Sequence, residues 1–189
     1  MIITYQGDNY IRLQAGDTVI LIDPTNYRSF KGALIALHTT LPTNLEKEEG
    51  DTFWIDRQGE YEVQEIRVLG TSAGNHEGVE YTIYKVILDD ISVGILGQLK
   101  KVPTPEMLEY VQNVDILILP AGDKPYISAQ DAAKLVRQLE PGIVIPTLFK
   151  NPNQFLKELD QEKVTPEEKL TIKKKDIAEG AGKVVVLKS

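Results

Sequence analysis

The chain has 189 residues and a formal net charge of −7; 42% of the residues are hydrophobic and 26% are charged. The length predicts one domain over residues 1–189, and no apolar run approaches the roughly 20 residues of a membrane-spanning helix. The absence of cysteine excludes disulfides, thiolate nucleophiles and thiolate metal ligands, and the acidic balance argues against a nucleic-acid partner. Because the N-terminal segment also lacks the pattern of a signal peptide, we expect a cytoplasmic protein that binds neither nucleic acid nor membrane.

The first half of the chain has the pattern of β-structure. Short apolar or alternating segments are separated by turn residues such as Gly7-Asp8-Asn9 and Asp89-Asp90. Residues 70–78 are rich in glycine and polar side chains, and we expect them to form a loop that carries His76. The predicted strands cover residues 2–5, 10–13, 19–22, 33–37, 52–55, 59–63, 66–69, 81–88 and 91–96.

The second half of the chain alternates helical patterns with buried strands. Thr104 followed by Pro105 marks one helix start. Ser128 with Asp131 three residues later marks a second, and Asn153 is expected to cap a third. Further strands are predicted at residues 115–119, 143–145, 170–172 and 184–187. This order of elements favours an α/β domain of two sheets with helices outside.

Two polar residues stand directly after buried strands, where α/β proteins commonly place reactive groups. Asp23 follows the apolar run 19–22, and its carboxylate is either a site residue or the cap of the turn that follows. His38 ends the run 33–37 and opens a polar loop. It is either a general base that titrates near neutrality or a histidine hydrogen-bonded to the loop backbone. Asp23 and His38 are therefore the candidate catalytic residues.

Several segments, in order along nearly the whole chain, carry a resemblance to a known family. They are ITYQGDNYIRL, VILIDP, ALIALHTTLPTN, GEYEV, YTIYKVILDDISVGILGQL, VDILILPAG, AAKLVRQLEPGIVIPTLFK and the ending FLKEL…KLTIKKKD…VVVL. The chain resembles the metallo-β-lactamase superfamily, in particular its small stand-alone zinc-dependent hydrolases, which include L-ascorbate-6-phosphate lactonase-like proteins. The resemblance implies an αββα sandwich of two mixed sheets with outer helices and a site at one edge of the paired sheets.

In that family, histidines and carboxylates hold two metal ions and leave a position for an activated water. Matched to the family's motifs, His38 takes the place of the first histidine of His-x-His-x-Asp-His, and His76 that of a histidine in a later loop. The other ligand positions have changed in type. The rest of the first motif is replaced by Thr40, Pro42 and Thr43. Gln98 stands in place of the bridging aspartate, and Leu148 stands in place of the last histidine. Asp8 replaces an early histidine, whereas Asp23 is retained.

These replacements remove most of the chemistry that a metal needs. A neutral amide brings no charge to offset two cations, threonine is a poor zinc ligand and leucine is none. The resemblance therefore implies that the two-metal site is lost, and no cofactor is expected.

Two hypotheses for the function follow. The favoured one is a non-catalytic module that binds a small molecule or a protein, with assembly into a homo-oligomer as a further expectation. Its cleft would be lined by Asp8, Asp23, His38, Thr40, Thr43, His76, Gln98 and Leu148. The alternative is a hydrolase that keeps one weakly held zinc on His38, His76 and either Asp8 or Asp23, or that uses His38 as a general base without metal.

Overall fold

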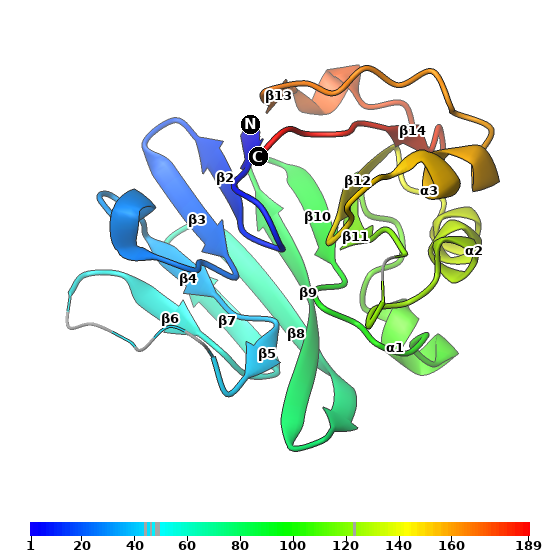
Figure 1. The fold of residues 1–189 in the computed structure, drawn as a ribbon. Helices are drawn as coiled ribbons and strands as arrows, with labels where there is room; N and C mark the ends of the chain where they lie inside the picture. The colour runs from blue at the N-terminus through cyan, green and yellow to red at the C-terminus, as the bar shows by residue number, and fades with distance from the viewer. Residues whose placement is uncertain (44, 46, 48–49, 123) are drawn as a thin grey trace.

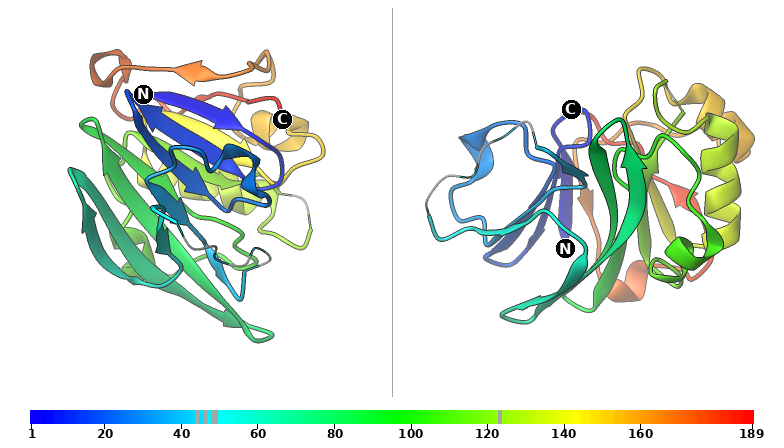
Figure 2. Two further views of the ribbon diagram at one scale, coloured as in Figure 1. Left: turned by 90° about the vertical axis from the view of Figure 1, so that its left-hand side faces the viewer. Right: turned by 90° about the horizontal axis from the view of Figure 1, so that it is seen from below.

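Two β-sheets packed face to face form the body of the protein, and the α-helices lie on one side of them (Figures 1 and 2). The computed structural model describes residues 1–43, 45, 47, 50–122 and 124–189. The predicted sandwich of two mixed sheets with outer helices is confirmed. No helix in the described ranges has the length and apolar character needed to cross a membrane.

The smaller sheet is built mainly from the N-terminal part of the chain. Its strand order is β13-β1-β2-β3-β4-β6, antiparallel from β13 to β3 and parallel from β3 to β6. The strands are β1 (Ile2–Tyr5), β2 (Ile11–Ala15), β3 (Thr18–Ile22), β4 (Ile35–Leu37), β6 (Phe53–Ile55) and β13 (Leu170–Thr171).

The larger sheet has the order β14-β12-β11-β10-β9-β8-β7, and β5 also pairs with β9. Its strands are β5 (Thr40–Leu41), β7 (Gly59–Val63), β8 (Ile66–His76), β9 (Val79–Leu88), β10 (Ile91–Ile95), β11 (Ile116–Pro120), β12 (Ile143–Thr147) and β14 (Lys183–Val184). The helices are α1 (Pro105–Glu109), α2 (Ala129–Leu139) and α3 (Asn153–Glu158), with short 3-10 turns η1 (Tyr27–Ser29) and η2 (Lys174–Asp176).

Strand alternation divides the apolar side chains between the interior of the sandwich and its two outer faces. Ile20 and Ile22 of β3 belong to the core between the sheets. Val19 and Leu21 point outwards and are covered by the segment 24–33, whose Phe30 packs against them. The smaller sheet is thus covered on this face by an irregular segment carrying η1.

The outer face of the larger sheet is covered by helices. The stripe Ala132, Leu135, Val136 and Leu139 of α2 packs in one cluster with apolar residues of β11 and β12. Ser128 Oγ accepts a hydrogen bond from Asp131 N at 3.1 Å, which confirms the predicted helix start.

The predicted loop 70–78 is mostly strand, so that expectation is wrong. β8 continues to His76 and pairs with β9, with a register shift between Ser72 and Asn75. Near the tip of this half-exposed hairpin, the strand is held by main-chain pairing and neither of its faces is fully buried. The sequence there therefore lacks the alternation of apolar and polar residues that would predict a strand. The ends of β8 and β9 project at the bottom of Figure 1. Asn153 is likewise not a cap, because α3 begins at Asn153 with Pro152 in the N-cap position.

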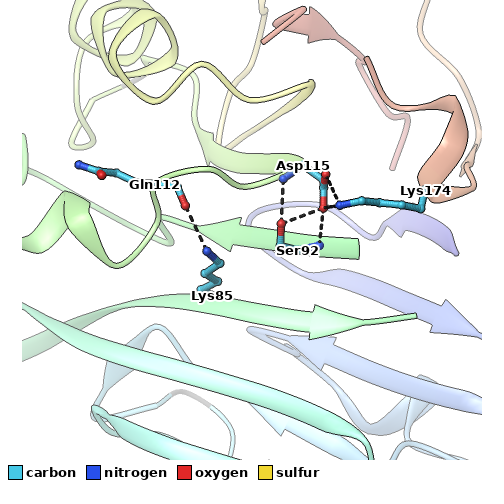
Figure 3. Close-up of polar contacts among 5 residues, drawn as sticks. All are labelled: Lys85, Ser92, Gln112, Asp115 and Lys174. Atoms are coloured by element: carbon cyan, nitrogen blue, oxygen red, sulfur yellow. Dashed lines mark hydrogen bonds and ion pairs between the residues drawn. The ribbon is translucent and has the colours of Figure 1, made fainter. Parts of the chain in front are cut away.

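Asp115, at the amino-terminal end of β11, ties the C-terminal segment to the larger sheet (Figure 3). Its Oδ2 accepts hydrogen bonds from Ser92 N and Ser92 Oγ, both at 2.8 Å, and from Lys174 Nζ at 2.7 Å. Nearby, Lys85 Nζ donates to the Gln112 carbonyl at 3.1 Å. Burial raises the pKa of Asp115, but hydrogen bonds from Lys174 and Ser92 outweigh it and hold that pKa below its usual range.

Removing the Lys174 ammonium should weaken this tie. Since the folded-state pKa of Asp115 is lowered, its ionised form stabilises the fold above the unfolded-state pKa, and that stabilisation is lost as pH falls through the folded-state pKa. We expect Lys174→Met to lower the free energy of unfolding by about 1 kcal/mol at pH 7 and by less in acid, measured by urea denaturation. Lys173→Met is the matched control, and an equal loss at Lys173 would contradict the assignment.

Candidate functional site

The carboxyl ends of strands from both sheets meet around Asp23. This residue follows β3 with a left-handed backbone (φ 45°) and is only 7% exposed. Its carboxylate accepts hydrogen bonds from Thr39 N at 2.6 Å, Thr39 Oγ1 at 2.5 Å and Asn9 Nδ2 at 2.6 Å. A longer contact of 3.5 Å comes from Gln98 Nε2. One carboxylate therefore joins the β1–β2 turn, the segment after β4 and the segment after β10.

Asn9 extends this network to the larger sheet. Its Oδ1 accepts a hydrogen bond from Thr147 Oγ1 at 2.9 Å, and Thr147, the last residue of β12, is fully buried. One residue later, Leu148 N donates to the Asp8 carbonyl at 3.1 Å. The β1–β2 turn is thus held against the end of β12 by both side-chain and backbone bonds.

Gly97 allows the Gln98 segment to approach Thr39. A Cβ on Gly97 would lie 2.4 Å from Thr39 Cβ, and the Gly97 backbone is left-handed (φ +64°). Both conditions disfavour any side chain at this position. The close approach leaves the Gln98 amide beside Asp23, at the position where the family resemblance places a metal-bridging aspartate.

The four described donors to Asp23 are all electrically neutral. They are one backbone N–H, one hydroxyl and two side-chain amides. An ionised carboxylate offers about four acceptor positions, and hydrogen bonds to a charged acceptor are among the stronger ones in proteins. Neutral hydrogen-bond donors therefore occupy acceptor positions of the buried Asp23 carboxylate.

His38 lies on the opposite side of the smaller sheet from the core. Leu37 points between the sheets, so the next side chain points outwards. The His38 imidazole stacks on Trp54 of β6 with centroids 5.5 Å apart and planes 6° apart, and its buried Nε2 has no hydrogen-bond partner among the described residues. Burial lowers the pKa of His38, opposed by the carboxylates of Asp23 and Asp56. We infer that the ring is neutral at pH 7.

His76 has different surroundings. It ends β8, is half-buried, and its Nδ1 lies 3.4 Å from Glu77 Oε2. Lys100 Nζ lies 3.9 Å from the same carboxylate oxygen of Glu77. The contacts of the two histidines are therefore separate: His38 contacts Trp54, whereas His76 lies beside Glu77.

Among the other predicted site residues, the structure brings only Gln98 into contact with Asp23. Thr40 lies in β5 and Thr43 Oγ1 donates to the Leu45 carbonyl at 2.7 Å. Asp8 is exposed, whereas Leu148 is 8% exposed. Within the described residues, no group of three or more His, Asp or Glu side chains is arranged to hold a metal ion.

Two tyrosines stand near Asp8. Tyr5 Oη donates to the Asp8 carbonyl at 2.8 Å, and burial raises the pKa of Tyr5 to about 12. Burial also raises the pKa of Tyr126, with a further contribution from the Asp8 carboxylate. Both phenols therefore remain neutral hydroxyls at physiological pH.

Sequence reasoning missed three members of the network, Asn9, Thr39 and Thr147. In the sequence Asn9 has the pattern of a turn residue, and no local pattern marks Thr39 or Thr147. The available signal was position: each lies within two residues of a strand end at the same edge of the sandwich.

Comparison with known proteins places these residues in a family context. Residues 2–148 match the family model described as the beta-lactamase superfamily domain. No curated protein matches the chain.

Several solved structures are similar over nearly the whole chain. One is a candidate zinc-dependent hydrolase of the metallo-β-lactamase superfamily from Thermotoga maritima, 24% identical, covering 98% of this chain and 97% of that one, with a TM-score of 0.83. A candidate metal-dependent hydrolase from Parabacteroides distasonis is 17% identical, with coverages of 97% and 91% and a TM-score of 0.72. The metallo-β-lactamase fold protein YhfI from Bacillus subtilis is 12% identical, with coverages of 97% and 90% and a TM-score of 0.68. At these identities the likeness shows a shared fold.

Replacing the Asp23 carboxylate should destabilise the whole edge. Asp23→Asn presents an NH2 group to donors that need an acceptor, and asparagine tolerates the left-handed backbone. We expect the free energy of unfolding to fall by about 3 kcal/mol, measured by chemical denaturation. Asp8→Asn, at an exposed residue whose backbone is also left-handed, should change it by less than about 0.5 kcal/mol. Similar losses in the two variants would contradict the central role of Asp23.

The His38–Trp54 stack should give a pH-dependent signal. Since the folded-state pKa of His38 is lowered, the unfolded chain takes up a proton first, and stability falls as pH drops below about 6.5 towards the folded-state pKa. Trp54 is the single tryptophan, so its fluorescence should titrate with a midpoint below about 6.5. The transition should vanish in His38→Gln and persist in His76→Gln; a midpoint at or above the ordinary value would refute the burial argument.

Proposed function

The chain belongs to the beta-lactamase superfamily, and we propose that it is a member without metal-dependent hydrolase activity whose cleft binds a small polar ligand. The observation that carries the proposal is the hydrogen bonding of the Asp23 carboxylate. Four neutral donors from three segments occupy its carboxylate. Those interactions join the strand ends through hydrogen bonds from neutral groups.

The donor set around Asp23 does not fit the zinc that the family implies. Catalytic zinc is typically held by three protein ligands drawn from histidine, carboxylate and thiolate. Here the nearest side chains are those of Asn9, Thr39 and Gln98, which bring amides and a hydroxyl. His38, the first histidine of the matched motif, stacks instead on Trp54. We therefore derive no reaction step through a metal.

The same groups are suited to hydrogen-bonded recognition. Gln98 is half-buried, and among the described residues its side chain makes one hydrogen bond, the 3.5 Å contact with Asp23. Its amide thus keeps donor and acceptor capacity for a ligand. The Asp8 carboxylate lies close enough to Tyr126 to add to the rise in the pKa of that phenol, which burial mainly causes. A small molecule with both donors and acceptors matches this set.

Zinc binding tests the proposal directly. We expect protein purified without a histidine tag to contain no stoichiometric zinc by elemental analysis and to show no tight binding by calorimetry, because the ligand positions hold neutral or apolar side chains. About one tightly bound zinc per chain, abolished by both His38→Ala and His76→Ala, would overturn the proposal in favour of a single-metal hydrolase.

A restored variant serves as the positive control. The substitutions Thr40→His, Pro42→Asp, Thr43→His, Gln98→Asp and Leu148→His return the family's ligand types to the matched positions. This variant should acquire zinc if the fold still supports the site. Uptake by the variant and not by the natural chain would attribute the loss to these side chains.

A further inference from the structure

A cavity of about 350 Å³ lies on the outer face of the smaller sheet, beside η1. Figure 2 shows the segment that carries η1 on the opposite side of the sandwich from the α-helices. The walls of the cavity include three aromatic residues, Tyr27, Phe30 and Trp54, together with Asp51 and Thr52. Trp54 faces outwards because the next residue of β6, Ile55, points into the core.

The three rings form a corner. Tyr27 and Phe30 have centroids 5.1 Å apart and planes tilted by 55°, and Phe30 stacks on Trp54 at 5.3 Å and 29°. The imidazole of His38 stacks on Trp54 at 5.5 Å and so supports the ring from within the fold. The corner is therefore held in place by ring contacts in the structure itself, which lowers the entropy cost of using it for binding.

The electrostatic character of the cavity favours a cation. Aromatic faces carry partial negative charge, and Asp51 adds a carboxylate to the described lining, which contains no lysine or arginine. The Thr52 hydroxyl already donates to the Ala33 carbonyl at 2.9 Å. The described walls thus present aromatic rings and a carboxylate, and they include no cationic side chain.

We propose that this cavity binds a small organic cation that carries a quaternary ammonium group. Aromatic rings attract such a cation within about 6 Å, and its methyl groups fill apolar space that a hydrated ammonium would not. Asp51 contributes the charge complement at the mouth. The site is separate from the Asp23 network and does not depend on the function proposed for it.

Fluorescence of the single tryptophan provides the assay. At pH 8, where His38 is neutral, titration with choline should give a saturable change in Trp54 emission. The neutral isostere 3,3-dimethylbutanol should bind about tenfold more weakly, because it matches the shape without the charge. Equal affinity for both compounds, or no saturable change by fluorescence and no heat by calorimetry, would overturn the proposal.

Variants separate the ring and charge contributions. Phe30→Leu should abolish choline binding, and Asp51→Asn should weaken it about fivefold. Asp17→Asn removes the same charge from the β2–β3 turn and should leave binding unchanged. If Phe30→Leu fails to fold, as judged by circular dichroism, the comparison of Asp51→Asn with Asp17→Asn still decides, and equal effects in those two variants would refute a cation site at Asp51.

Discussion

The Asp23 carboxylate accepts hydrogen bonds from residues that lie 14 to 75 positions away along the chain. Through Asn9 it also reaches Thr147, which is 138 positions from Asn9. A buried anion is costly unless it is well bonded, so the loops that donate to it are constrained to remain together. The arrangement of the edge therefore depends on this one group and on the complement of neutral donors around it.

Most of the fold could be predicted, because its signals are local. The hairpin at Asp89-Asp90 and the start of α2 at Ser128 each depend on residues within a few positions of one another. The site was less predictable, because its bonds join distant segments. Asn9 and Thr147 give no sign in the sequence that they meet. The extension of β8 to His76 was hidden for a similar reason, since only the pairing with β9 makes those residues a strand.

The two histidines show how geometry limits what a motif match can establish. Both occupy positions that correspond to metal ligands in the family resemblance. Yet the alternation of β4 directs His38 to the outer face and onto Trp54, while His76 lies next to Glu77. Trp54 therefore contacts two rings: the imidazole of His38, which stands next to Thr39 of the Asp23 network, and the ring of Phe30.

The pairing of β1 with β13 has a consequence for how the protein is made. Ile3 lies opposite Leu170 in the smaller sheet, so the edge of a sheet begun by the first residues is closed only by residues near the other end. During synthesis β1 emerges from the ribosome long before its outer partner, and its main-chain groups on that side stay solvated or are shielded by chaperones meanwhile. Such long-range closure slows folding relative to a helical bundle of equal size, and it makes translation through β13 a precondition for completing the N-terminal sheet.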